Sequence, residues 1–424
     1  MGTNVPNLGN DDLDDDFNFA PATKRIRTVK SVYTVEDRQN SVFFVWYLKP
    51  FDERGDNDIP LLDEDSDEAI EFQNVFRVPY VSFLSIASSF ANRKQIIDVT
   101  GKRSIDHRLL VLGSLRLLAW GSIFKSLEEL TCVSKTTHRA FFLEEFLVWG
   151  ENLARDNVFL PRTDKEYDAV ERVYHEKGLP GCVGSIDCVH VTWDNCRSGL
   201  KGECKGKAPN PTLAFEVVVD HDLCTWLIST YNFGAQNNKT IAQHNKAVRV
   251  VRTPKTFLSR KTFETRRAGQ PMRTHSGSYY ICDVGYAPYM CLMPPFKDQL
   301  ETSVYFGWLK HVELLQKDVE CTFGVLKKSF MILKNPICLL CPKHIQSVFV
   351  TCCALHNALL KHNNNNGNNY EYKNKDKNED NKTDNESKDN NNVMETTTQE
   401  QFHNQRNALV EHYNVCVADH SLVL

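Results

Sequence analysis

The sequence predicts an α/β protein in which a helical region precedes a sheet-containing domain. Apolar residues recur at helical spacing between residues 72 and 157. From residue 179 onward, glycine and proline punctuate runs of β-forming residues, and long helical stretches follow. The 424 residues are 41% hydrophobic and 25% charged, and no run approaches the roughly 18–20 apolar residues of a membrane helix. The composition argues against membrane, collagen-like and small secreted proteins.

The N-terminal segment, residues 1–71, is predicted to be mostly disordered, because it holds 17 acidic and 7 basic side chains. Within it, residues 41–51 are strongly apolar and are read as a strand or a short docking segment. No secretory signal is visible, so the 14 cysteines are expected to be reduced thiols. The expected location of the protein is the nucleus, or both the nucleus and the cytoplasm. A basic cluster is either a nuclear-import signal or a chance grouping: Lys24, Arg25, Arg27 and Lys30.

Residues 72–157 are predicted to be helical, with a leucine stripe that ends at Gly121. After it, Ser126 and Glu129 have the spacing of a capping box, and Ser134 is suited to cap a second short helix. The two helices would meet at residues 131–133 in a helix-turn-helix pattern, and a plain helical bundle is the alternative. In the first interpretation the second helix presents Lys135 and Arg139 to DNA.

Residues 158–362 are predicted to form the α/β domain. The expected order is a strand, a hairpin, a helix, a strand and two long helices, over residues 179–193, 212–233, 235–253, 278–283, 303–333 and 342–362. This is the layout of an RNase H-like domain. Residues 363–393 are of low complexity, with 13 asparagines between 363 and 392, and residues 394–424 form a weakly amphipathic tail.

Three acidic residues occupy three different elements of this layout. Asp187 lies inside the first strand, Asp283 closes the strand at 278–283, and Glu320 lies on the following helix. Taken singly, each acid has a structural alternative: Asp187 as a salt-bridged core residue and Asp283 as a turn residue before Gly285. The alternative for Glu320 is an exposed helix glutamate, which is the favoured interpretation for Glu320 alone. Taken together, they match a site in which oxygen ligands hold divalent metal ions for phosphoryl transfer.

A second charged feature lies between the hairpin and the strand at 278–283. Residues 72–362 carry a net charge of +11, which suits a polyanionic partner. Part of that charge is clustered beside the predicted site, at Arg249, Arg252, Lys255, Arg260, Lys261, Arg266, Arg267 and Arg273. Contact with DNA phosphates is favoured over a solvated loop because the cluster is dense and close to the acids.

Three other features are interpreted as structural or left open. Cys338 and Cys341 have C-x-x-C spacing near His344, but a tetrahedral zinc site needs four ligands, and core packing is favoured. Core packing is also favoured for the cysteine pair at 352–353. Trp193 is either a surface on which a base stacks or an aromatic residue at the edge of the core.

Four motifs, in order, resemble the PIF/Harbinger transposases, and most closely the branch known as plant transposon protein. They are GCVGSIDCVHVTWDNC, YYICDVGYAPYMCLMPPF, KDVECTFGVLKKSF and TCCALHN, within a similarity that runs from about residue 72 to 361. The resemblance implies an RNase H-like DDE nuclease domain after a helix-turn-helix-like region. It also implies two Mg²⁺ or Mn²⁺ ions, DNA with terminal inverted repeats as substrate, a separate Myb/SANT-like partner protein and a homo-oligomer.

The resemblance assigns the family's three acids to Asp187, Asp283 and Glu320. This chain departs from the family at Asn238, where an aspartate is expected, and at Gln316, where a basic residue is usual. An asparagine offers a carbonyl oxygen to a metal but no charge. The predicted activity is DDE-type hydrolysis and transfer of DNA phosphodiester bonds. The alternatives are an inactive, domesticated DNA-binding or scaffold protein and an RNase H-like nuclease that acts on RNA.

Overall fold

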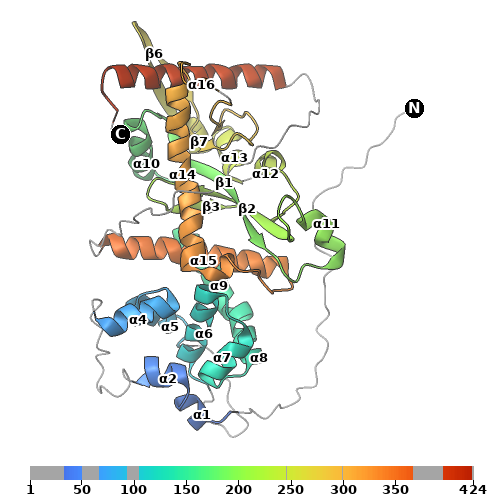
Figure 1. Ribbon diagram of the computed structural model, residues 1–424. Helices are drawn as coiled ribbons and strands as arrows, with labels where there is room; N and C mark the ends of the chain where they lie inside the picture. Colours follow the sequence, from blue (N-terminus) through green and yellow to red (C-terminus); the bar gives the residue numbers. More distant parts are fainter. Residues whose placement is uncertain are drawn as a thin grey trace.

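The chain folds into a helical N-terminal part and a C-terminal part built on a mixed sheet (Figure 1). The computed structural model describes residues 33–49, 66–92, 105–244, 246–297, 299–365 and 395–422. The basic cluster at residues 24–30 and most of the asparagine-rich segment lie outside these ranges. No helix within them is long and apolar enough to cross a membrane.

The helical part begins earlier than the composition suggests. The apolar segment at 41–51 does not form the strand considered for it; it contains helix α2, because Ser41 caps the helix and Phe43 is buried against Phe76, with ring centroids 5.4 Å apart. The described residues between 33 and 71 are therefore mostly helical. The helices of this part are α1 (Val35–Gln39), α2 (Val42–Tyr47), α4 (Asp67–Phe76), α5 (Tyr80–Ser88), α6 (His107–Trp120), α7 (Phe124–Thr131), α8 (Lys135–Phe141), a π-helical turn (Phe142–Phe146) and α9 (Leu147–Asn157).

The predicted pair of short helices is present as α7 and α8. Ser134 caps α8, since its hydroxyl accepts a hydrogen bond from the Thr137 N–H, and Cys132 makes the turn with φ of 50°. The capping box predicted at Ser126 is wrong: α7 begins at Phe124, and the Ser126 hydroxyl donates to the Ile123 carbonyl instead. The leucine-rich helix α6 does end at Gly121, which adopts φ of 64°.

The sheet has the strand order β3-β2-β1-β7-β8, with β4 also paired to β2. Strand β1 is antiparallel to β2 and parallel to β7, and β7 is parallel to β8. The strands predicted near 179–193, 212–233 and 278–283 are confirmed, although the last part of the hairpin is divided into β3 and β4. Strand β8 and the separate β5–β6 hairpin were not predicted. The strands are β1 (Cys182–Thr192), β2 (Thr212–Val219), β3 (Thr225–Ile228), β4 (Asn232–Phe233), β5 (Thr262–Arg267), β6 (Gln270–Ser276), β7 (Tyr279–Cys282) and β8 (Leu292–Met293).

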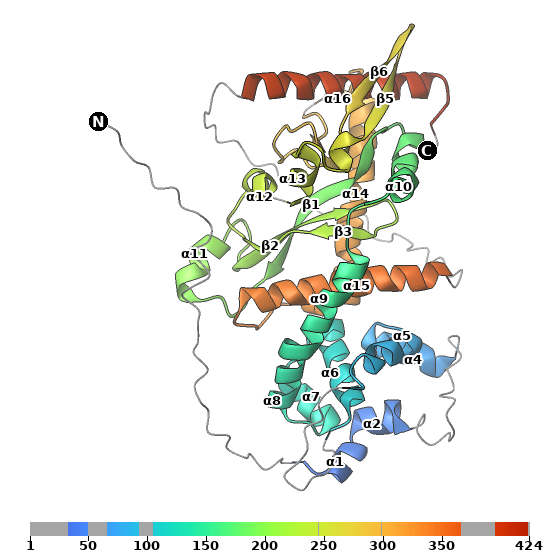
Figure 2. The same cartoon turned by 180° about the vertical axis from the view of Figure 1, so that it is seen from behind.

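Helices cover both faces of the sheet (Figures 1 and 2). On one face, Val319 and Phe323 of α14 join the core with alternate residues of β1 and β2. On the other, apolar residues of α12 and α13 pack with Ile186 and Val218. The helices of this part are α10 (Asp164–Glu176), α11 (Lys201–Cys204), α12 (Asn238–His244), α13 (Lys246–Arg252), α14 (Phe306–Ser329), α15 (Pro342–Asn365) and α16 (Glu395–Ala418).

Helix α16 corrects the expectation of a weak C-terminal tail. It packs on β5 and α14 and buries Phe402, Leu409 and Val410 (Figure 1). Helix α15 is anchored by Asn357, whose amide accepts from the Thr225 N–H and donates to the Thr225 and Asn157 carbonyls. These bonds join α15 to β3 and to the end of α9, and so connect the helical part to the sheet.

Candidate active site

Two of the three predicted acids lie side by side on neighbouring parallel strands. The parallel register pairs Ile186 of β1 with Cys282 of β7, so that Asp187 and Asp283 are the next residues on the two chains. Asp187 is half-buried and Asp283 is exposed. Asp283 follows the carboxyl end of β7, and Asp187 lies at the same level in the middle of β1, so the parallel register places the two residues side by side.

The third acid, Glu320, lies on the helix that covers this face. Side chains alternate along a strand, so Asp187 points to the same side of β1 as Val189 and Val191. Those two valines share a core cluster with Val319 of α14, the neighbour of Glu320. Glu320 is exposed at the surface of the helix. The structure thus places all three acids on or beside one face of the sheet.

The electrostatics of Asp187 reflect that placement. Burial raises the pKa of the Asp187 carboxyl to about 7, and the nearby charges of Asp283 and Glu320 contribute to the rise. The Cys188 N–H acts in the opposite direction, because it hydrogen-bonds the carboxylate. A substantial fraction of Asp187 is therefore protonated near neutral pH, and a cation that offsets its two acidic neighbours would favour the ionised form.

Asp283 also makes the contacts expected of a turn residue, which was the alternative to its being a metal ligand. Its Oδ1 accepts from the Val284 N–H at 2.6 Å, and its Oδ2 is 3.4 Å from the Gly285 N–H. These bonds fix the carboxylate at the strand end. The turn and the ligand interpretations are therefore compatible, since the turn holds the group in place and leaves it exposed.

Asn238 lies beside Asp283, at the first residue of α12. A Cβ added at Gly285 would stand 3.3 Å from Asp283 Oδ2 and 3.6 Å from Asn238 Nδ2. The amide of Asn238 and the carboxylate of Asp283 therefore face the same small space, which Gly285 keeps open. The position at which the resemblance leads us to expect an aspartate is a neighbour of Asp283 in this fold.

A fourth acid, Glu216, was not predicted from the sequence. It lies on β2 opposite Cys188, on the face of the sheet away from Asp187, and it is fully buried. Burial raises its pKa to about 8, the neighbouring hydroxyl of Tyr286 lowers it, and Asp187 raises it. Neither carboxylate oxygen has hydrogen-bond geometry with a described residue. An acid inside the apolar run TLAFEVVVD is the signal that could have identified it.

The acidic residues have the donor atoms that a divalent cation needs, but their side chains are too far apart to hold one as they stand. Their donors are all oxygens, which Mg²⁺ prefers, and their mutual repulsion is what a bound cation would relieve. Across the described ranges, however, no three histidine, cysteine, aspartate or glutamate side chains are close enough together to hold a metal ion. Side-chain movement at the exposed Asp283 and Glu320 would be needed to complete a ligand set.

The predicted phosphate-binding residues divide into two groups. Five are exposed: Arg249, Arg252, Lys255, Arg260 and Arg273. The Arg252 guanidinium lies 4.2 Å from the centroid of the Tyr289 ring. The other three are paired within the chain: Lys261 with Asp164, Arg266 with Asp419 and Arg267 with Glu411. Asp419 and Glu411 belong to the C-terminal segment that packs on the β5–β6 hairpin, so this segment offsets part of the predicted basic surface.

The α7–α8 pair presents a small polar surface. Lys135 and Arg139 are exposed, as the helix-turn-helix interpretation requires. His138, between them in sequence, is buried, and its Nε2 lies 2.7 Å from the Thr131 hydroxyl. Burial lowers the pKa of His138 to about 4, which keeps this histidine neutral. It stabilises the packing of α7 on α8 and is inaccessible to a ligand.

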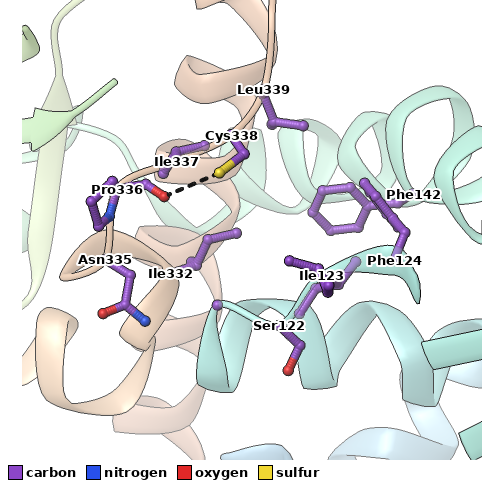
Figure 3. A pocket seen from close by; sticks show the side chains of 12 residues that line it. Ser122, Ile123, Phe124, Phe142, Ile332, Asn335, Pro336, Ile337, Cys338 and Leu339 are labelled. Carbon is purple, nitrogen blue, oxygen red and sulfur yellow. Dashed lines mark hydrogen bonds between the residues drawn. The ribbon is translucent and has the colours of Figure 1, made fainter. Parts of the chain in front are cut away.

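The structure also shows which of the cysteines considered above are core residues. Cys338 is exposed, and its thiol donates to the Pro336 carbonyl at the edge of an apolar cavity of about 220 Å³ between the helical part and the loop after α14 (Figure 3). Core packing is therefore wrong for Cys338 and correct for Cys352 and Cys353, which are fully buried. Trp193 is a core residue whose indole N–H donates to the Leu339 carbonyl.

Comparison with known proteins bears on the sheet-containing part. A family model described as "Plant transposon protein" matches residues 159–367, the segment that carries β1 to β8, α14 and α15. No curated protein and no solved structure matches the chain. The family match supports a transposon-related family and a transposase-related function. The matched range includes Asp187, Asn238, Asp283 and Glu320.

Proposed function

We propose that the protein is a Harbinger-like DDE transposase, or a nuclease derived from one, that hydrolyses and transfers DNA phosphodiester bonds. The observation that carries the proposal is the meeting of Asp187 and Asp283 on parallel strands, with Glu320 on the helix above. The strand order β3-β2-β1-β7-β8, with one antiparallel half and one parallel half, is the order expected for an RNase H-like sheet and so supports the proposal.

Asp187, Asp283 and Glu320 would hold two Mg²⁺ or Mn²⁺ ions, with the Asn238 amide as an auxiliary oxygen donor. When bound, such ions lower the pKa of a coordinated water and stabilise the charge of the departing oxygen. The chain's own contribution is to position the ligands. The turn after β7 orients Asp283 through two backbone N–H groups, and the core beneath β1 fixes Asp187.

The proposal extends to DNA contacts and partners. The exposed Lys135 and Arg139, together with the exposed arginines of the 249–260 segment, would contact backbone phosphates. Terminal inverted repeats as the target, a Myb/SANT-like partner protein, assembly as a homo-oligomer and action in the nucleus follow from the resemblance and belong to the same proposal.

A second candidate is a catalytically inactive, domesticated transposase that binds DNA or serves as a scaffold. Asn238 favours it, because the amide beside Asp283 supplies no negative charge where the family has an aspartate. The spacing of the acids, too wide for a metal in the described chain, points the same way.

The experiment is a nicking assay on supercoiled and terminal-repeat DNA, in Mg²⁺, Mn²⁺ or EDTA, with and without a Myb/SANT-like partner. We expect metal-dependent nicking by the wild type and its loss in Asp187→Ala. Activity that arises only in Asn238→Asp would establish the inactive alternative with an otherwise sound site. No nicking by any variant would overturn the enzymatic proposal, and equal nicking of an RNA substrate would redirect it to RNA.

A further inference from the structure

The connection between β1 and β2, residues 194–211, forms an exposed basic loop at the edge of the sheet (Figures 1 and 2, α11). Lys201, Lys205 and Lys207 are exposed, and none of them forms a salt bridge with the residues that the structure describes. Lys201 is the first residue of the single-turn helix α11, and Lys205 follows its last residue. The loop is separate from the basic cluster at residues 249–273.

The loop is held in place by close backbone packing. The Ala235 N–H donates to the Glu203 carbonyl at 3.0 Å. A Cβ at Gly206 would stand 2.2 Å from the Gly234 carbonyl oxygen, and one at Gly234 would stand 2.6 Å from the Cys204 carbonyl oxygen. Two backbones can approach this closely only through glycine. Cys204 is buried beneath the loop, so the lysines project from a fixed base.

This packing connects the loop to the candidate active site. The segment that contacts it, Gly234–Ala235, leads within three residues to Asn238, whose side chain lies beside Asp283. Three residues span at most about 11 Å when fully extended. The loop follows the carboxyl end of β1, and Asp187 lies five residues before that end, at the level of Asp283. The contact with Gly234–Ala235 is therefore what brings the loop toward the acids.

We propose that this basic loop binds the DNA backbone next to the bond at the acidic site, and so positions the substrate strand. The inference rests on the proposed function and specifies which surface holds its substrate. Unpaired lysines on a rigid loop suit a regular array of phosphates, which recur about every 3.4 Å along each strand of a duplex. The acids repel DNA, and the loop places compensating positive charge beside them.

The first test measures binding of a labelled duplex in EDTA, at several salt concentrations, so that cleavage plays no part. Lys201→Gln/Lys205→Gln is compared with Lys165→Gln/Lys334→Gln, which removes the same charge from exposed lysines elsewhere. The slope of log K against log salt should fall by about 0.9 for each phosphate that is no longer neutralised, and thus by about 1.8 in the loop variant alone. Equal slopes in the two variants would overturn the proposal.

A second pair of variants tests position without changing charge. Gly206→Ala must displace the loop from Gly234, whereas Gly199→Ala meets nothing within 4 Å. We expect weaker DNA binding only in Gly206→Ala, with circular dichroism confirming that both variants fold. Tighter binding of duplex RNA than of DNA through the same lysines would also contradict the proposal. Lysine-dependent binding without nicking by the wild type would refute the enzymatic function alone, and nicking with lysine-independent binding would refute this inference alone.

Discussion

Asp187 and Asp283 are neighbours on parallel strands, one residue beyond the paired Ile186 and Cys282. Burial and the charges of Asp283 and Glu320 together raise the pKa of Asp187 to about 7. A half-buried carboxyl that faces two further acids is costly to ionise, and such arrangements gather at functional sites. This cost, together with the contacts around the acids, determines how the protein should respond to substitution.

Replacement of Asp187 by asparagine should stabilise the metal-free protein at alkaline pH. The pKa is about 7 in the folded state and near 3.8 in the unfolded state, so the folded state binds the extra proton between these values and stability falls as pH rises through the window. Three pKa units correspond to about 4 kcal/mol, and solvent at the half-buried side chain reduces that figure. Thermal unfolding should show a higher Tm for Asp187→Asn at pH 8 and little difference at pH 4.

Glu216→Gln should have a similar effect through a different group. The buried carboxyl has a pKa of about 8, against an ordinary value of 4.5, so its destabilising contribution grows from about pH 4.5 to pH 8. We expect a higher Tm than the wild type at pH 9, and convergence of the two at pH 5. Glu264→Gln, at an exposed position of β5, is the matched control and should show no pH-dependent gain. If Glu216→Gln were less stable than the wild type at pH 9, the Glu216 carboxylate could not be buried without a hydrogen-bond partner.

Asn238→Asp should lower the stability of the metal-free protein and raise its affinity for a divalent metal ion. The new carboxylate would lie beside Asp283, where like charges repel, so the metal-free variant should unfold at a lower temperature than the wild type at pH 8. Mn²⁺ should reverse the difference, because an added charged oxygen ligand strengthens binding of a divalent cation. Calorimetric titration with Mn²⁺ checks the affinity. Asn237→Asp, at the adjacent helix cap, is the control; an equal gain there would show a general charge effect.

Release of the arginines held by the C-terminal segment should strengthen DNA binding. Asp419→Asn/Glu411→Gln removes the partners of Arg266 and Arg267 on β5 and keeps the shape of both side chains. Exposed ion pairs contribute about 0–1 kcal/mol each, so stability should change little. Anisotropy titrations should give a lower Kd and a steeper salt dependence than in Glu400→Gln, an exposed control on the same helix. An unchanged Kd would mean that these arginines face away from DNA.

The elements predicted correctly from sequence are those with a strong apolar pattern. Strand β1, the β2–β3 hairpin and strand β7 are runs of buried β-forming residues, and α14 has a continuous apolar face. Such patterns are local, so they can be read without knowing what packs against them. Asp187 and Asp283 stood out for the same reason, as acids at defined places within apolar strands.

The missed features depend on contacts between distant parts of the chain. The β5–β6 hairpin is rich in charge, and β6 is almost entirely exposed, so it has no apolar alternation to detect. Helix α16 buries polar side chains such as Gln405 and His412, whose Nδ1 accepts from the Arg266 N–H. Its partner surface is that same unpredicted hairpin. Sequence alone could not reveal that it offsets part of the basic cluster.

A Mn²⁺ titration of the full-length protein, followed by electron paramagnetic resonance, tests most directly whether the acids form a metal site. We expect the wild type to bind two ions at pH 8, and Asp187→Asn and Asp283→Asn each to lose at least one. Glu264→Gln should bind as the wild type does. Wild-type protein that binds no Mn²⁺, or an Asp187→Asn variant that binds as many ions with equal affinity, would contradict a metal site built on these acids.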